Sequence, residues 1–229
     1  MNINHPLVKG KVKEIKPFIY CVEVDDDYDR AMLFCRYQEF YESPYKKFRS
    51  KSFTWMEYMR FYKTAWNKKT FTYPDDWSGY NIPSNVIEKA NNIFNKDTEY
   101  DVVMNNIYYH CAIDSQNKNN NTRCDWYLIG ASSKDKGTLN HEIAHGLYFT
   151  NKAYKKMVDA LINNITSTHY NKLKKKLIKM GYVDDNKIID DEIQAFMSTG
   201  LYNGLNTKEL KVYEKDFKNN FKKFNNERK

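Results

Sequence analysis

Cysteine is scarce in this sequence, and its spacing excludes two common kinds of site. The four cysteines among 229 residues are Cys21, Cys35, Cys111 and Cys124. They lie far apart and form no Cys-x-x-Cys pair, so they match neither a zinc ribbon nor a thioredoxin-type redox site. We therefore expect four free thiols.

Long apolar segments and internal repeats are also missing. No window approaches the roughly 18 apolar residues that a helix needs to cross a bilayer. The N-terminal residues Met-Asn-Ile-Asn-His-Pro do not resemble a secretory signal, which has an apolar run after a basic segment. We expect no membrane span, a cytoplasmic location and a single domain over residues 1–229.

The composition is that of a folded protein with an excess of positive charge. Hydrophobic residues make up 41% of the chain and aromatic residues 16%, which excludes a disordered chain. The net charge is +8, and Lys and Arg are densest in 152–179 and 208–229. Such an excess can attract nucleic acid, but charges interspersed along helices usually form a solvated face. We do not expect nucleic acid as the partner.

Residues 1–123 are expected to form an N-terminal part with a small sheet and helices. Residues 11–24 are rich in β-branched and aromatic residues, which predicts a strand or hairpin arm. Apolar residues at helical spacing predict helices over 28–42, 53–66, 85–95 and 99–114. We expect Ser84 to cap the third of these helices, after an ordered loop at 71–83, and 115–122 to form an exposed turn.

Residues 124–229 are expected to form a strand and a series of helices. A short apolar run at 124–131 predicts a strand that ends in a tight connection. A helix is predicted to follow from Thr138, and Lys-rich helical patterns cover 151–180, 187–204 and 207–225. The fold class is therefore α+β and predominantly helical.

The helix that begins at Thr138 contains the most informative motif, His141-Glu142-Ile143-Ala144-His145. Residues four apart lie on one face of a helix, so both imidazoles can bind one tetrahedral metal ion. Glu142 lies too far round the helix to be an equivalent ligand, but it can accept a proton from a metal-bound water. The alternative is a surface helix with two solvated histidines and an ordinary glutamate.

The strand Tyr127-Leu128-Ile129-Gly130 and the segment Thr138–Leu147 resemble the strand and active-site helix of the zincin metallopeptidases. The resemblance is limited to this part of the chain. It implies a zincin-like domain with a cleft between a small sheet and the motif helix. In zincins the strand nearest the cleft pairs with an extended peptide substrate, and residues 126–131 are expected to be that strand.

A catalytic zinc ion normally has three protein ligands, so one more is needed. The metzincin pattern requires a glycine three residues after the second histidine and then a third histidine, but Tyr148 occupies that position. A gluzincin-like site uses a glutamate from a later helix, and Glu192 is our choice, because its apolar neighbours make a metal partner necessary. Asp191 or Asp190 are alternatives, either as ligands or as acceptors of the second N–H of a ligating histidine.

The three acids at 190–192 also have a simpler explanation, since the helix dipole favours acids near a helix N-terminus. The sequence lacks the ExxSD or ExxxD-type extension of some gluzincins, so no subfamily is assigned. A donor that stabilises an oxyanion is expected near the metal, and the candidates are Tyr182, Tyr148, His169 and His110. Trp77 and Tyr80 either line a substrate groove or fix their loop to the core.

These features predict a zinc-dependent metallopeptidase that holds one Zn²⁺ per chain and hydrolyses protein or peptide substrates through a water activated by Glu142. The alternative is a catalytically silent zincin-scaffold protein with a binding or regulatory role and a basic nucleic-acid-binding surface. A third hypothesis is metal-assisted hydrolysis of a non-peptide amide. The sequence leaves the oligomeric state open.

Overall fold

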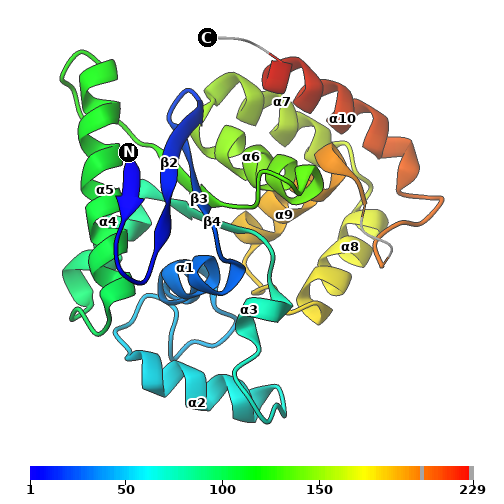
Figure 1. Ribbon diagram of the computed structural model, residues 1–229. Coiled ribbons are helices and arrows are strands. Elements are labelled where there is room, and N and C mark those ends of the chain that lie inside the picture. The colour runs from blue at the N-terminus through cyan, green and yellow to red at the C-terminus, as the bar shows by residue number, and fades with distance from the viewer. Residues whose placement is uncertain (202–203, 227–229) are drawn as a thin grey trace.

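The computed structural model describes residues 1–201 and 204–226 (Figure 1). Its strands are β1 (Asn2–Asn4), β2 (Lys9–Lys16), β3 (Ile19–Val24), β4 (Tyr80–Pro83) and β5 (Tyr127–Gly130). Its helices are α1 (Asp27–Glu42), α2 (Trp55–Ala65), α3 (Tyr73–Asp76), α4 (Ser84–Ile93), α5 (Glu99–Lys118), α6 (Lys136–Thr150), α7 (Lys152–Asn163), α8 (Ser167–Lys179), α9 (Asn186–Thr199) and α10 (Lys211–Asn226).

The strands form one mixed sheet in the order β1-β2-β3-β5-β4. Strands β3 and β5 are parallel, and the other neighbouring pairs are antiparallel. The single strand or hairpin arm predicted over 11–24 is in fact two antiparallel strands, β2 and β3, and the turn between them places Phe18 at a φ of 62°. Because β5 lies between β3 and β4, the N-terminal and C-terminal parts of the chain share one sheet.

Alternating residues of the central strands direct their side chains into two separate hydrophobic cores. Tyr20 and Val22 of β3 face a core formed with α1, α2, α4 and α5. Ile19 and Cys21 face a second core formed with α6 to α10. Helices therefore cover both faces of the sheet (Figure 1), and the predicted α+β, predominantly helical fold class is confirmed.

Helix α6, which contains the motif, lies unusually close to the sheet. Asp135 caps its N-terminus by accepting hydrogen bonds from the backbone N–H groups of Gly137 and Thr138. At Gly146 a Cβ atom would lie 2.8 Å from Cδ1 of Ile19, so only glycine permits this approach of helix and strand. The residue after the second histidine of the motif thus sets the distance between α6 and β3.

Some of the predicted elements are wrong in their details. The loop at 71–83 contains α3 and β4, and α5 continues through the polar stretch as far as Lys118. Ser84 does not cap α4, because its hydroxyl oxygen accepts the backbone N–H of Trp126 at 3.1 Å. The predicted helix over 151–180 is divided into α7 and α8, while the break near Gly181 is confirmed.

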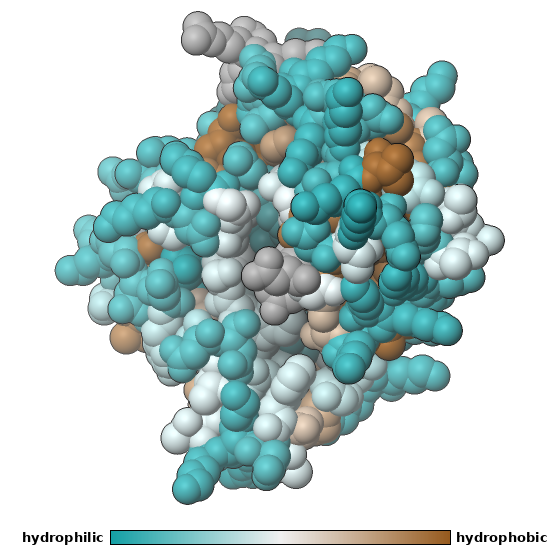
Figure 2. Space-filling model, turned by 90° about the vertical axis from the view of Figure 1, so that its right-hand side faces the viewer, coloured by the Kyte–Doolittle hydropathy of each residue, from teal (hydrophilic) through white to brown (hydrophobic). Residues whose placement is uncertain are grey.

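The surface is mainly hydrophilic on the side where α8 and α10 lie (Figure 2), in agreement with their many lysines. Within 1–201 and 204–226, no helix has the length and apolarity needed to cross a membrane. All four cysteines are free thiols, as expected.

Candidate metal centre

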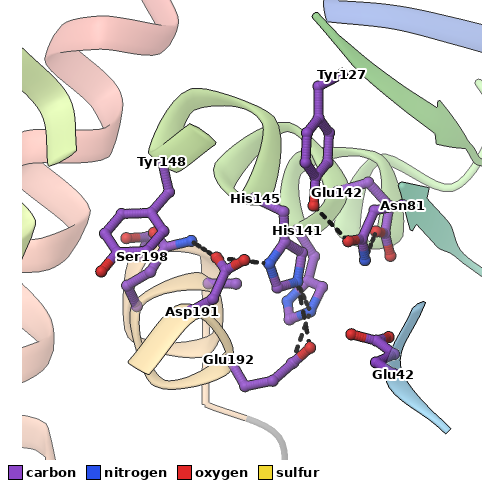
Figure 3. Close-up of polar contacts among 12 residues, drawn as sticks. Glu42, Asn81, Tyr127, His141, Glu142, His145, Tyr148, Asp191, Glu192 and Ser198 are labelled. Carbon is purple, nitrogen blue, oxygen red and sulfur yellow. Dashed lines mark hydrogen bonds and ion pairs between the residues drawn. The ribbon is translucent and has the colours of Figure 1, made fainter. Parts of the chain in front are cut away.

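His141, His145 and Glu192 form a compact cluster between α6 and α9 (Figure 3). The two Nε2 atoms lie 3.2 Å apart, and the Glu192 oxygens lie 3.7 Å from Nε2 of His141 and 3.6 Å from Nε2 of His145. Ligand atoms of a tetrahedral zinc ion lie roughly 3.3–3.4 Å apart, because each metal–ligand bond is about 2.0–2.1 Å long. The two Nε2 atoms are close to this spacing, and one donor atom from each of the three groups lies within 4.8 Å of the others, so the cluster can converge on one metal ion.

The chemistry of the cluster also fits a metal ion. Two imidazole nitrogens that face each other at this distance need a proton or a cation between them, since each presents a lone pair in its neutral metal-binding form. Glu192 is only 3% exposed, and its Oε2 has no hydrogen-bond partner among the described residues. Two imidazoles and one carboxylate match the donor set of catalytic zinc sites.

Asp191 orients one of the two histidines. Its Oδ1 accepts a hydrogen bond from Nδ1 of His145 at 2.8 Å, which leaves Nε2 as a lone-pair donor toward Glu192 and His141. Oδ1 also accepts from Nε2 of the buried Gln194 at 2.9 Å, and the hydroxyl of Tyr154 donates to Oε1 of Gln194 at 2.9 Å. A chain of hydrogen bonds inside the second core therefore fixes the ring of His145.

The electrostatics of the cluster are those of a site that binds a cation. Burial acts to lower the pKa of His145, but the charges of Asp191 and Glu192 raise it well above its ordinary value. Burial acts to raise the pKa of Glu192, but His145, His141 and Tyr182 together leave it lowered. Because zinc requires neutral imidazole, metal binding would release a proton here.

Glu142 is held beside the cluster by the edge of the sheet. It is 5% exposed, and its Oε2 accepts a hydrogen bond from Nδ2 of Asn81 at 2.9 Å (Figure 3). Oδ1 of Asn81 accepts in turn from the hydroxyl of Tyr127 at 2.6 Å. A Cβ atom on Gly79 would lie 2.2 Å from Oε1 of Glu142, so a larger residue there would displace the Glu142 carboxylate. Burial raises the pKa of Glu142, although the two histidines act to lower it.

The cluster opens into a cleft with a volume of about 420 Å³. The cleft is lined by residues of α1, the segment from α3 to β4, α6, α9 and the loop before α9. Helices α1 and α6 lie on opposite faces of the sheet, and the cleft is formed where both extend past the β4 edge. Trp77 and Tyr80 line it and also pack on the first core, so both interpretations of these rings hold.

The prediction that 126–131 is the strand nearest the cleft is wrong. Strand β5, with Tyr127, Leu128, Ile129 and Gly130, is paired on both sides, with β3 and with β4. It therefore has no free edge for a peptide. The edge strand beside the cleft is β4, which was hidden within a segment whose prolines and glycine are typical of a loop.

Of the four candidate oxyanion donors, the structure brings Tyr182 alone to the cleft. Burial and the charges of Glu192, Glu42 and Glu142 raise the pKa of its hydroxyl, which therefore stays protonated. Tyr148 donates to Asp159 at 2.6 Å, and Nδ1 of His169 lies 3.0 Å from the Tyr213 hydroxyl. His110 lies on α5. Tyr148, His169 and His110 are therefore wrong as candidates.

The choice among the three acids is resolved by the direction of their side chains. Glu192 joins the cluster, and Asp191 contacts His145 as described above. Asp190 accepts a hydrogen bond from the Tyr170 hydroxyl at 2.7 Å and lines a separate hollow, so neither role suggested for it holds. Successive residues of a helix point in different directions, which explains why only one of the three reaches the two imidazoles.

Several residues of the site could not be found from the sequence. Asn81 holds Glu142 of the motif, Gln194 holds Asp191, and Gln38 and Glu42 reach the cleft from α1. None of them lies in a recognisable motif, and α1 is about 100 residues from the histidines. Their proximity depends on how the sheet joins the two parts of the chain.

Comparison of the chain with protein-family models, with curated proteins and with solved structures gave no match. The interpretation of the site therefore depends on the chemistry and geometry of its own residues.

Proposed function

We propose that the protein is a zinc-dependent metallopeptidase, with His141, His145 and Glu192 as the ligands of one Zn²⁺ ion and Glu142 as the general base. The observation that carries this proposal is the convergence of three donor groups within 4.8 Å of one another beside a buried carboxylate, at the wall of an open cleft. An open coordination position is what distinguishes a catalytic zinc site from a structural one.

Zinc at this position would supply an activated water and would polarise the carbonyl group of the substrate. Glu142 would accept the proton of that water and pass it to the leaving amine. Asn81 keeps the Glu142 carboxylate in place through its 2.9 Å hydrogen bond. Tyr182 would donate a hydrogen bond to the oxygen that becomes negatively charged in the transition state.

The edge strand supports a peptide as the substrate. Strand β4 pairs with β5 on one side, and Asn81 of β4 borders the cleft together with Ser78 and Gly79, which directly precede the strand. An extended peptide can add to such an edge by main-chain hydrogen bonds. The Asn81 N–H is already bound to Oε1 of Gln38 at 3.2 Å, so the position for substrate pairing would lie toward Ser78 and Gly79.

A catalytically silent scaffold is less well supported. Four protein ligands are expected for a closed structural zinc site, whereas three ligand groups gather in the described part of the chain. A nucleic acid is disfavoured as the occupant of this cleft, because among the described residues its lining includes five carboxylates and no Lys or Arg.

The decisive experiment is the substitution Glu142→Gln. We expect the purified protein to contain close to one zinc ion per chain and to cleave an unstructured protein such as casein. Glu142→Gln should retain the zinc and reduce cleavage at least about 100-fold, because it removes the general base and leaves all three ligands. Zinc is measured by elemental analysis and cleavage by release of peptides.

Glu209→Gln is the matched control, since this glutamate pairs with Lys172 at 2.6 Å on the surface. We expect it to have wild-type activity and zinc content. Undiminished cleavage by Glu142→Gln, with cleavage by the wild type that is insensitive to chelators, would exclude the mechanism.

A further inference from the structure

The cleft has the opposite charge to the protein as a whole. The chain carries a net charge of +8, yet the acids Glu39, Glu42, Asp76, Glu142 and Glu192 all line the cleft. No Lys or Arg is found among the described residues that line it. Glu192 is explained as a proposed zinc ligand, and Glu142 is explained as the proposed general base. The carboxylates of α1 have no role in that chemistry.

Glu42 is held in a defined position toward the cluster. The Asn81 N–H donates to Oε1 of Gln38, so Nε2 of Gln38 faces Glu42 and donates to its Oε1. The Glu42 carboxylate is directed toward the space beside Glu192 and Glu142 (Figure 3). No ion pair joins it to a Lys or Arg in the described part of the chain. It is an oriented carboxyl group without a Lys or Arg partner among the described residues.

Glu39 lies three residues earlier on α1 and lines the same cleft. It is 8% exposed, and its Oε2 has no hydrogen-bond partner within normal geometry among the described residues, although the nearby hydroxyl groups of Ser43, Tyr58 and Tyr73 act to lower its pKa. A buried, unpartnered carboxylate oxygen is costly unless something else binds it. Glu39 is thus a second acceptor at this wall of the cleft, independent of the hydrogen bonds that orient Glu42.

Aromatic rings form the wall next to these two acids. Tyr73, Trp77 and Tyr80 line the cleft, and the ring centroids of Tyr73 lie 6.3 Å from those of Trp77 and of Tyr80. The alkyl chain of a lysine or arginine packs well against such rings, and its charged end is attracted to their faces. Apolar walls that lead to carboxylates suit a long cationic side chain.

We propose that Glu39 and Glu42 form a subsite that binds a cationic group of the substrate, an amine or a guanidinium, beside the metal. The substrate class is then a peptide with a basic group near the bond that is cleaved. This inference rests on the proposed peptidase function and adds the specificity of the same site. The group comes either from a Lys or Arg side chain or from a free N-terminal ammonium.

The test uses the zinc-loaded full chain and quenched fluorescent peptides that are identical except at one position. That position carries arginine, citrulline, lysine, norleucine or glutamate and is moved along the peptide, and each peptide is made with a free and an acetylated N-terminus. We expect kcat/KM to be about 10- to 100-fold higher for the peptide with the cation than for its neutral counterpart, as for a charge-assisted hydrogen bond. The acetylated set separates a side chain from an N-terminal amine.

The variants Glu42→Gln and Glu39→Gln assign the preference to these residues. Each should reduce the ratio between cationic and neutral peptides about tenfold or more, mostly through KM, while cleavage of the neutral peptides persists. Asp76→Asn is the control within the cleft, because Asp76 already has Lys68 at 3.6 Å and accepts from Thr72 at 2.6 Å. Equal rates for cationic and neutral peptides, or a preference unchanged in both glutamine variants, would overturn the proposal.

A binding experiment separates this inference from the proposed function. The zinc-loaded Glu142→Gln variant is titrated calorimetrically with the arginine peptide and the citrulline peptide. Tighter binding of the arginine peptide, lost when Glu42→Gln is added, supports the subsite even if the wild type cleaves nothing. Equal binding of the two peptides overturns the subsite even if the wild type is an active peptidase.

Discussion

The two walls of the cleft contain the same kind of side chain in opposite electrostatic states. On the α9 wall, Glu192 lies within 4 Å of both imidazoles, and its pKa is lowered despite burial. On the α1 wall, burial raises the pKa of Glu39 to about 7, and burial with the charge of Glu192 raises the pKa of Glu42 well above its ordinary value.

The difference lies in the counter-charge, since all three carboxylates are removed from water. Desolvation alone disfavours the charged form of a carboxylate, and only a nearby cation reverses its effect. The histidines supply that cation on the α9 wall. On the α1 wall no Lys or Arg lines the cleft among the described residues, and the charge of His145 only partly offsets burial at Glu42, so the α1 wall is suited to a cation from outside. We expect substitutions on the α9 wall to affect metal and kcat, and those on the α1 wall to affect KM and stability.

The largest effect in this comparison is expected for Tyr182→Phe. Tyr182 lies in the loop that leads into α9, and it is the proposed donor to the oxyanion. Loss of one donor to a developing oxyanion typically reduces kcat about 100- to 1,000-fold. KM and zinc content should change little. The measurement is steady-state kinetics on the best peptide, with elemental analysis of zinc.

Tyr148→Phe is the matched control, since its hydroxyl donates to Asp159 and lies outside the cleft. We expect wild-type kcat for this variant. A normal kcat for Tyr182→Phe would assign the oxyanion role to another group and limit the α9 wall to metal binding.

Asp191→Asn should have an intermediate effect. It replaces the charged acceptor of the His145 Nδ1–H, so the imidazole becomes a weaker and less oriented ligand. Substitutions of such partners typically weaken metal affinity about 10- to 100-fold. Competition with a zinc chelator measures the affinity.

The neighbouring substitution Asp190→Asn tests whether charge alone matters. Asp190 lies on the same helix but binds the Tyr170 hydroxyl instead of the cluster. We expect unchanged zinc affinity. A similar loss in both variants would mean that the α9 wall acts through its total charge and not through the hydrogen bond to His145.

Glu39→Gln should act on stability against pH and not on metal affinity or kcat. The pKa of Glu39 is about 7 in the folded protein, against the ordinary value of 4.5 that applies in the unfolded chain. The folded state therefore holds more protons than the unfolded state between pH 4.5 and 7. The contribution of Glu39 to stability is therefore present below about pH 4.5 and is lost as the pH rises through about 7, a change of about 3 kcal/mol.

Replacing Glu39 by the neutral isostere removes that dependence. Denaturant unfolding at pH 5 and pH 8 should give a free energy of unfolding that declines less for Glu39→Gln than for the wild type. An identical decline in the free energy of unfolding for the two proteins would show that burial does not raise the pKa of Glu39. The difference between the two walls would then depend on Glu42.

The motif residues were predictable because helical geometry is local. His141 and His145 share one face of α6 and Glu142 lies beside them wherever that helix forms, since four residues make about one turn. The sequence showed that a third ligand was needed, but it offered three neighbouring acids for that role, and Glu192 was selected from them. Free thiols, β-structure within 11–24 and most helices followed in the same way from spacing and composition.

The edge strand was not predictable from local pattern. Pro83 and Gly79 are typical of a loop, and the four residues of β4 become a strand because β5 provides a partner. The assignment of β5 as the substrate strand failed for the same reason, since strand order is not encoded in the strand itself.

By itself, the sequence determined an α+β fold rich in helices and a pair of histidines with an adjacent glutamate on one helical face, because these depend on residues within a few turns of one another. Only the tertiary structure decided that Glu192 completes the cluster, that β4 forms the edge of the cleft and that α1 brings two carboxylates without cations to face it. Those relations join segments far apart in the chain, and packing of two cores on one sheet establishes them.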